Sequence, residues 1–135
     1  MFADAGTADV VALQTTTSGS YTDLSTVGPA VTLSLVNGQG CLVLIAARGS
    51  NSLGGTSGQA CFSFAVTGAT SLAANDSNGV ESHAILTPGS QQQMSLRATW
   101  FVASATGSHT FTMKYKAQTG GTASFTERRI IVKKF

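Results

Sequence analysis

Apolar and polar residues alternate along most of this chain with the two-residue period of β-strands. In residues 30–36, for example, valine and leucine at the odd positions alternate with threonine and serine. No segment has a convincing helical period, so the pattern predicts an all-β chain. We expect a single jelly-roll or β-sandwich domain of about eight antiparallel strands over 15–135, preceded by a short N-terminal arm at 1–14. The predicted strands are 10–15, 30–36, 41–47, 60–66, 81–86, 93–103, 109–117 and a last one from 122 or 126 to the end.

Three local patterns add detail. Asn37-Gly38 predicts a hairpin, because a type I′ turn needs positive φ at both central residues. The continuously apolar run 41–47 predicts a strand covered on both sides, in the middle of a sandwich or against another subunit. Two later strands each place their apolar residues on one face, namely Leu96, Ala98, Trp100 and Val102, and then His109, Phe111, Met113 and Tyr115.

The composition adds one informative feature, the small number of charged residues. Only 10% of the 135 residues are charged, the net charge is +2, and 42% are hydrophobic. A disordered chain usually combines low hydrophobicity with high net charge, so we expect a folded domain. A monomer of this size normally carries both signs of charge over its surface. We therefore expect part of the surface to be covered by copies of the chain or by a larger assembly, although polar uncharged residues are an alternative means of solvation.

The charges are also unevenly distributed, since seven of the eight basic residues follow Glu81. A basic half can indicate nucleic acid as a partner. Here Lys114 and Lys116 alternate with Met113 and Tyr115, as on the solvent face of a strand. No basic run is interleaved with stacking aromatics. We expect solvated strand faces, or pairing with acidic segments of a neighbouring subunit, and no nucleic-acid partner.

Motifs that carry catalysis are missing from the sequence. His83 and His109 lack the spacing of a metal pair, no G-x-S-x-G elbow occurs, and Glu81 and Glu127 are not placed for glycoside hydrolysis. Asp76 lies in a polar loop that suggests either a weak calcium site or a plain turn, and the turn is favoured. We expect no enzyme activity, no cofactor and no metal.

Redox and targeting signals are equally sparse. Cys41 and Cys61 lie in apolar strand-like segments, where they form either a disulfide between neighbouring strands or two buried thiols. A reducing cytoplasm favours the thiols. The first residues show neither the positive nor the apolar region of a secretion signal. The longest apolar stretch, 41–47, is too short to span a bilayer, so we expect no membrane partner.

A carbohydrate site at Trp100 or Tyr115 is a further alternative, but both lie on apolar strand faces typical of a core.

Several segments together resemble small virion proteins of tailed bacteriophages, notably those of actinobacteria. The resemblance extends over about 15–135; each segment is weak alone, and their order and spacing carry it. The segments are TTTS (15–18), YTDL (21–24), GPAV (28–31), FAVTGA (64–69), LTPG (86–89), GSHTFTMKYK (107–116) and GGTASFTERRIIV (120–132).

This resemblance implies a jelly roll similar to the trimeric heads of tumour necrosis factor (TNF) and C1q, with apolar and aromatic side chains along a threefold axis. It implies a capsid decoration protein, a head fibre, or a minor tail or receptor-binding protein. A tail protein usually needs an adaptor and a shaft, whereas only 1–14 precede the domain. We therefore expect a homotrimeric decoration (cement) protein, made in the bacterial host cytoplasm, that binds the major capsid protein on the outer surface of the virion. The alternative is a minor tail protein that binds the host surface through loops 49–59 and 68–79. A third interpretation, a bacterial C1q-like or lectin-like module, has no secretion signal to support it.

Two sets of residues follow as site hypotheses. The capsid contact is expected at Phe2, Val10, Val11 and Leu13. The trimer axis is expected at Trp100, Phe101, Tyr115 and Ile131. For each axis residue, a place in the interior of one sandwich is the alternative.

Overall fold

A computed structural model describes residues 4–53, 58–83 and 92–135. Over these residues the chain is all-β, with nine strands and one short 3-10 helix, η1 (Asp76–Asn78). The predicted fold class is confirmed. The strands are β1 (Ala5–Val10), β2 (Gln14–Thr16), β3 (Ala30–Leu35), β4 (Gly40–Asn51), β5 (Gln59–Gly68), β6 (Val80–His83), β7 (Gln93–Val102), β8 (Gly107–Gln118) and β9 (Ala123–Lys134).

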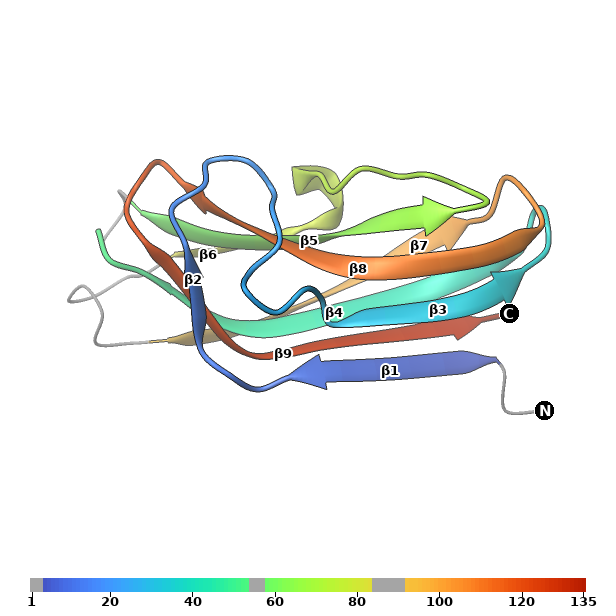
Figure 1. Ribbon diagram of the computed structural model, residues 1–135, viewed down its shortest axis with the longest axis horizontal. Helices are drawn as coiled ribbons and strands as arrows, with labels where there is room; N and C mark the ends of the chain where they lie inside the picture. The colour runs from blue at the N-terminus through green and yellow to red at the C-terminus, as the bar shows by residue number, and fades with distance from the viewer. Residues whose placement is uncertain (1–3, 54–57, 84–91) are drawn as a thin grey trace.

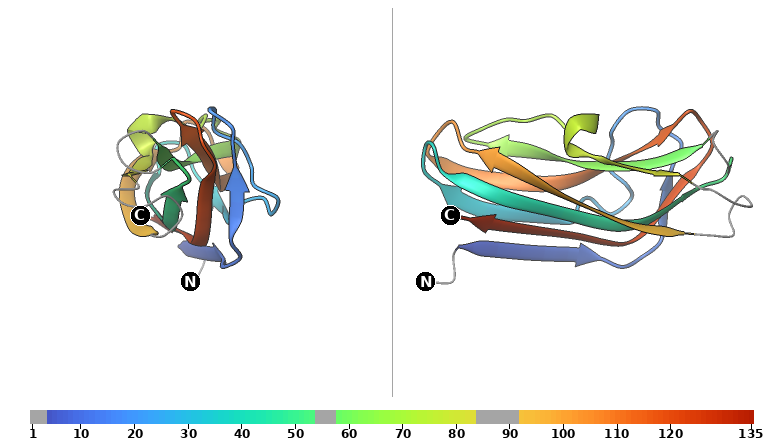
Figure 2. Two further views of the ribbon diagram at one scale, coloured as in Figure 1. Left: turned by 90° about the vertical axis from the view of Figure 1, so that its left-hand side faces the viewer. Right: turned by 180° about the vertical axis from the view of Figure 1, so that it is seen from behind.

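The strands form two antiparallel sheets that pack face to face (Figures 1 and 2). The five-stranded sheet has the order β1-β9-β4-β7, and β2 pairs with the far part of β9. The four-stranded sheet has the order β3-β8-β5-β6. Strands far apart in the sequence are therefore neighbours, and the start of β1 lies beside the end of β9 through the pair Ala5 and Lys133. This is the strand exchange between two sheets that defines a jelly roll.

The core fills the space between the sheets with alternate residues of the long strands. On β8 the predicted face of His109, Phe111, Met113 and Tyr115 points inward and is fully buried. Phe111 makes an edge-to-face contact with Phe101 at 5.2 Å between ring centroids. His109 is a satisfied core residue, since its ring nitrogens lie 2.9 Å from the Gly107 carbonyl and 2.8 Å from the Thr70 hydroxyl.

The predicted hairpin at Asn37-Gly38 is wrong. The turn itself forms, with Gly38 at φ +83° and the Gln39 amide donating to the Val36 carbonyl at 3.0 Å. However, β3 pairs with β8, while β4 pairs with β7 and β9 in the other sheet. The two strands joined by this turn therefore face each other across the core. Turn chemistry fixes the local backbone but does not specify whether the strands share a sheet.

The start of the chain also differs from the expected arm. Residues 5–10 form β1, an edge strand whose six residues all pair with β9. Gly6 faces Val31 of β3 so closely that a Cβ at this position would clash with it. Small residues therefore allow β1 to close the sandwich, and β1 belongs to the folded domain.

Candidate functional site

The outer side of the five-stranded sheet carries a continuous apolar surface. The alternating residues of β7 that the sequence grouped together point outward, and Leu96 and Trp100 are 61% and 58% exposed. The strand register places them beside the outward residues of β4, because Trp100 pairs with Leu42 and Leu96 pairs with Ala46. We call the following set the apolar face: Met94, Leu96, Ala98, Trp100, Val102, Leu42, Leu44, Ala46 and Ile131.

The orientation of β7 corrects the expectation that Trp100 belongs to a core. Phe101, the next residue, is the one that packs inside. Two further inward positions are polar and are bonded at the open edge of the sandwich: Ser95 bonds Ser82 at 3.0 Å between hydroxyl oxygens, and Arg97 donates to the Ser77 and Gly79 carbonyls. A register shift by one residue would bury Trp100 and break these contacts. An edge strand with an exposed sheet face normally turns polar residues outward, so this inversion marks the face as an interaction surface.

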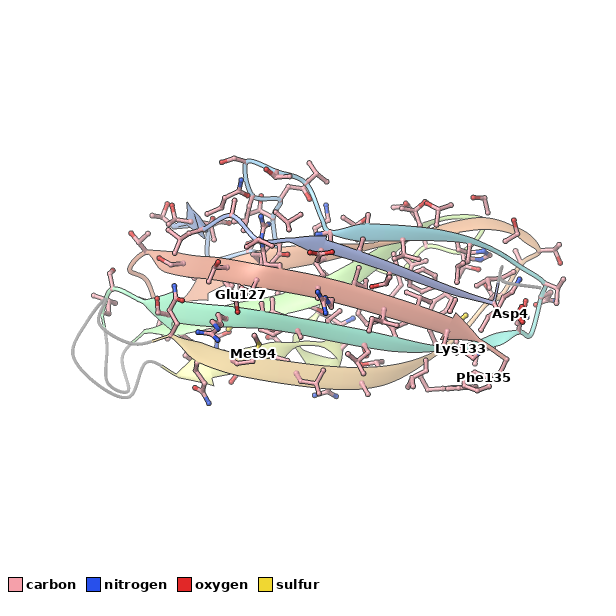
Figure 3. The ribbon with its side chains drawn as sticks, turned by 90° about the horizontal axis from the view of Figure 1, so that it is seen from below. Asp4, Met94, Glu127, Lys133 and Phe135 are labelled. Carbon is pink, nitrogen blue, oxygen red and sulfur yellow. The ribbon has the colours of Figure 1, made fainter. Side chains whose placement is uncertain are left out.

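One end of the apolar face is an aromatic corner. The Trp100 indole lies over Gly40, where any Cβ would clash with it. Its ring centroid is 5.5 Å from that of Phe135, and the Lys133 Nζ is 5.8 Å from the Phe135 centroid. Figure 3 shows Lys133 and Phe135 together at this end of the sheet, with Met94 and Glu127 farther along it.

Toward the opposite end, a β-bulge brings charges onto the same side of the sheet. The register of β4 against β9 shifts between Ala46 and Arg48, and Glu127 adopts φ +49°, a conformation that few non-glycine residues take. Glu127 accepts from Arg48 Nε at 2.8 Å. A hollow of about 390 Å³ lies here, lined by Asp9, Val11, Ala46, Met94, Glu127 and Arg129. The apolar face is thus bordered by both signs of charge.

The predicted trimer-axis residues separate into two pairs. Trp100 and Ile131 lie on the apolar face, from β7 and β9. Phe101 and Tyr115 lie inside one sandwich, 7% and 0% exposed, so the axis prediction is wrong for these two and the interior alternative holds. The Tyr115 hydroxyl donates to the Gly28 carbonyl at 2.9 Å, and the buried Arg128 lies over its ring. Neither side chain can reach another copy.

The predicted capsid-contact residues lie at the β1 side of the sheet. Val11 and Leu13, between β1 and β2, are exposed, and Val11 lines the hollow described above. Val10 is half-buried at the end of β1. Phe2 lies outside the described residues. The structure thus brings Val11 next to the apolar face, which the sequence pattern did not suggest.

Asp76 and the two cysteines, which the sequence raised as candidates for metal binding and for a disulfide, have structural roles. Asp76 accepts hydrogen bonds from Lys116 Nζ at 2.6 Å and from Tyr21 Oη at 2.8 Å, so its carboxylate is paired within the chain. Over the ranges described above, no three His, Cys, Asp or Glu residues are grouped as metal ligands. Cys41 and Cys61 are buried free thiols in different sheets. In the same ranges no helix has the length and apolar character needed to cross a membrane.

Comparison with solved structures shows the fold. The chain is similar to the structure of Eiger TNF from S. frugiperda, with a TM-score of 0.55 and 12% identity over 97% of this chain and 91% of that one. It therefore has a TNF-like jelly-roll fold. Lower similarity is found to infectious bursal disease virus: the Gx strain structure (TM-score 0.48, 10% identity) and the VP2 subviral particle (TM-score 0.45, 10% identity). These matches cover 97% and 95% of this chain and 32% of each viral chain. No family model and no curated protein sequence matches the chain.

Proposed function

We propose that this protein is a non-enzymatic structural protein of a tailed bacteriophage particle, and that it assembles as a homotrimer through the apolar face. The observation that carries this proposal is the apolar face itself, an exposed set of large side chains that no segment among the described residues covers. Exposed apolar patches of this kind mark interaction surfaces. The phage assignment is supported by the segments that resemble phage virion proteins.

A second copy of the chain is the occupant that best fits the apolar face. The face extends to the free edge of β7, so the edge of one copy can pack on the face of the next. Such a head-to-tail contact closes into a ring when the rotation permits. The border offers both signs of charge, Asp9 and Glu127 with Arg129 and Lys133, and is therefore able to complement itself. Full burial of a large apolar side chain contributes roughly 1.5–3 kcal/mol, and the half-exposed side chains here retain about half of that.

We propose that the trimer is a decoration protein on the outer capsid surface. The proposed contacts to the major capsid protein are Phe2, Val10, Val11 and Leu13. A trimer that binds the assembled lattice but not free subunits stabilises the shell by mass action, and three weak contacts add as avidity. The proposed role involves no cofactor, nucleic acid or membrane.

Copy number in purified particles tests the location. Quantitative mass spectrometry against the major capsid protein is expected to give a fixed, high ratio to the shell. A few copies per particle would overturn the decoration role and place the protein on the tail, where host recognition becomes the leading function. Light scattering on the isolated protein tests the trimer separately.

Point substitutions test the capsid contact, because deletion of 1–13 would also remove β1 from the sheet. Val11→Ser with Leu13→Ser changes two exposed side chains. We expect lost binding to capsids with an unchanged oligomeric state. Unchanged capsid binding would eliminate these two residues as the contact.

A further inference from the structure

The outer side of the four-stranded sheet contains a cleft formed within a single chain. Two segments cross this side of the sheet, the loop after β2 and the segment that includes η1 (Figure 1). The Thr22 backbone bonds that of Tyr115 on β8, and the Ser63 hydroxyl on β5 donates to the Asn75 carbonyl at 2.8 Å. Between the two segments lies a cleft of about 470 Å³, lined by Gly19, Ser20, Tyr21, Ala74, Asn75, Asp76 and Lys116.

The polar groups of the cleft are held in fixed positions. The Lys116 side chain is only 10% exposed, and its Nζ lies 2.6 Å from Asp76 Oδ1 and 4.7 Å from the centroid of the Tyr21 ring. The Tyr21 hydroxyl donates to the same carboxylate oxygen. The hydrogen bond from Lys116 lowers the pKa of Asp76 most, and the hydrogen bond from Tyr21 lowers it further. The Asp76 carboxylate is therefore charged at neutral pH.

Hydrogen-bonding capacity remains unused in the cleft. Both bonds to Asp76 use Oδ1, and within the described residues nothing bonds Oδ2. The Ser20 hydroxyl likewise makes no hydrogen bond within the described residues. The hydrogen bonds between Ser20 and Ser18 use the backbone groups of Ser20 and the hydroxyl of Ser18. Asn75 is different, because its side chain caps η1 and donates to the Ala73 carbonyl. The free groups are therefore a carboxylate oxygen, a serine hydroxyl and the remaining ammonium protons.

We infer that this cleft binds a neutral saccharide unit. A hydroxyl group both donates and accepts, so adjacent sugar hydroxyls can donate to Asp76 Oδ2 and accept from Lys116 Nζ and Ser20 Oγ. Hydrogen bonds to charged groups are the strong ones in such a site. A charged ligand fits less well, because the Asp76–Lys116 pair is net neutral and gives neither sign of charge a net attraction.

The walls of the cleft fit the same ligand. Gly19, Ser20 and Ala74 are small and leave open space, and the Tyr21 ring offers an apolar surface for the C–H groups of a sugar. The cleft is shallow and open to solvent, so a bound sugar would keep part of its own surface in water. The cleft is on the sheet opposite the apolar face and belongs to one chain, so the inference does not depend on the trimer. A trimer would present three copies and raise the avidity for a repetitive glycan.

The test is titration of the ¹⁵N-labelled protein with single methyl glycosides: hexoses, 6-deoxyhexoses, N-acetylhexosamines and pentoses. We expect at least one sugar to shift the amide signals of 19–21 and 74–76 in a saturable manner. No shift with any of them, or shifts confined to another surface, would overturn the inference.

Three variants localise the effect. Asp76→Asn keeps the size of the side chain and is expected to weaken binding by roughly tenfold, the contribution of one charge-assisted hydrogen bond. Ala74→Leu fills the cleft without touching its polar groups and is expected to abolish binding. Asp23→Asn is the matched control, because Asp23 pairs with Lys114 on the same sheet at the same 2.6 Å but does not line the cleft. Wild-type affinity in both cleft variants, or an equal loss in the control, would contradict the inference.

Discussion

The outer faces of the two sheets differ in how much of each is covered by other segments of the chain. On the four-stranded sheet, the chain's own segments cover outward residues of β5 and of the second half of β8, and Lys114 and Lys116 pair with Asp23 and Asp76 from those segments. On the five-stranded sheet, the outward residues of β7 and β4 are apolar and remain open. The lysines of β8 were expected on a solvated face or against a neighbour, but the acidic partners come from the same chain.

This difference separates a sheet face that the chain's own segments cover from one that is left open to solvent. The covered face satisfies a buried ammonium group with a carboxylate and an aromatic ring, as burial of charge requires. Within the described residues no segment covers the open face, although it contains Trp100, the only tryptophan of the sequence. We infer that its cover comes from outside the chain.

The largest effect is expected from charge placed on the open face. Trp100→Asp combined with Leu96→Asp introduces two buried carboxylates into the proposed interface and is expected to convert the proposed trimer to monomers, measured by light scattering. Val27→Asp is the matched control, because Val27 is as exposed but lies outside the apolar face. A trimer that survives the double substitution would show that the apolar face is not the interface.

A smaller effect is expected from ion pairs on the two faces. Lys116→Ala removes a nearly buried partner of Asp76 and is expected to lower the free energy of unfolding by about 2 kcal/mol. Arg48→Ala breaks the pair with Glu127 on the open face, where both side chains are 47% exposed, and is expected to cost less than about 0.5 kcal/mol. Urea denaturation measures both. Equal losses would remove the distinction between a covered and an open face.

The third prediction concerns acid stability. Because the pKa of Asp76 is lowered in the folded state, its contribution is present above its unfolded pKa, about 3.9, and is lost as the pH falls through the lower folded value. The free energy of unfolding is therefore expected to decline below about pH 4. In Asp76→Asn this decline should be shallower. The same slope in both proteins would show that Asp76 does not contribute to it.

The smallest effect is expected from thiol reagents. Burial raises the pKa of the Cys61 thiol to about 11 and also raises that of Cys41, so little thiolate exists at pH 8. Both thiols should react with Ellman's reagent only after addition of urea. In Lys116→Ala the covering segment loses the ion pair with Asp76, so Cys61 should become accessible at a lower urea concentration than Cys41, which faces the core. Fast reaction of Cys41 in the native protein would contradict its placement in the core.

Much of the fold could be predicted from alternation. The pattern identified the strands near β3 to β9, and it grouped the correct residues on each face of β7 and β8. It missed β1, because AGTADV contains small residues and no large apolar side chain. It predicted part of the candidate site, Trp100 and Ile131, but added Phe101 of β7 and Tyr115 of β8. A pattern of period two groups the residues of one strand face but does not say which face turns inward.

The all-β class, the approximate strands and the shortage of charge follow from the sequence alone, because they depend on local period and composition. Other features exist only in the folded chain. The tertiary structure placed the strands joined at Asn37-Gly38 in opposite sheets, turned Phe101 inward and Trp100 outward, and brought Tyr21, Asp76 and Lys116 together across 55 and 40 residues of sequence separation. The physical reason is that sheet pairing and burial are properties of residues distant in the chain, which compete for one core.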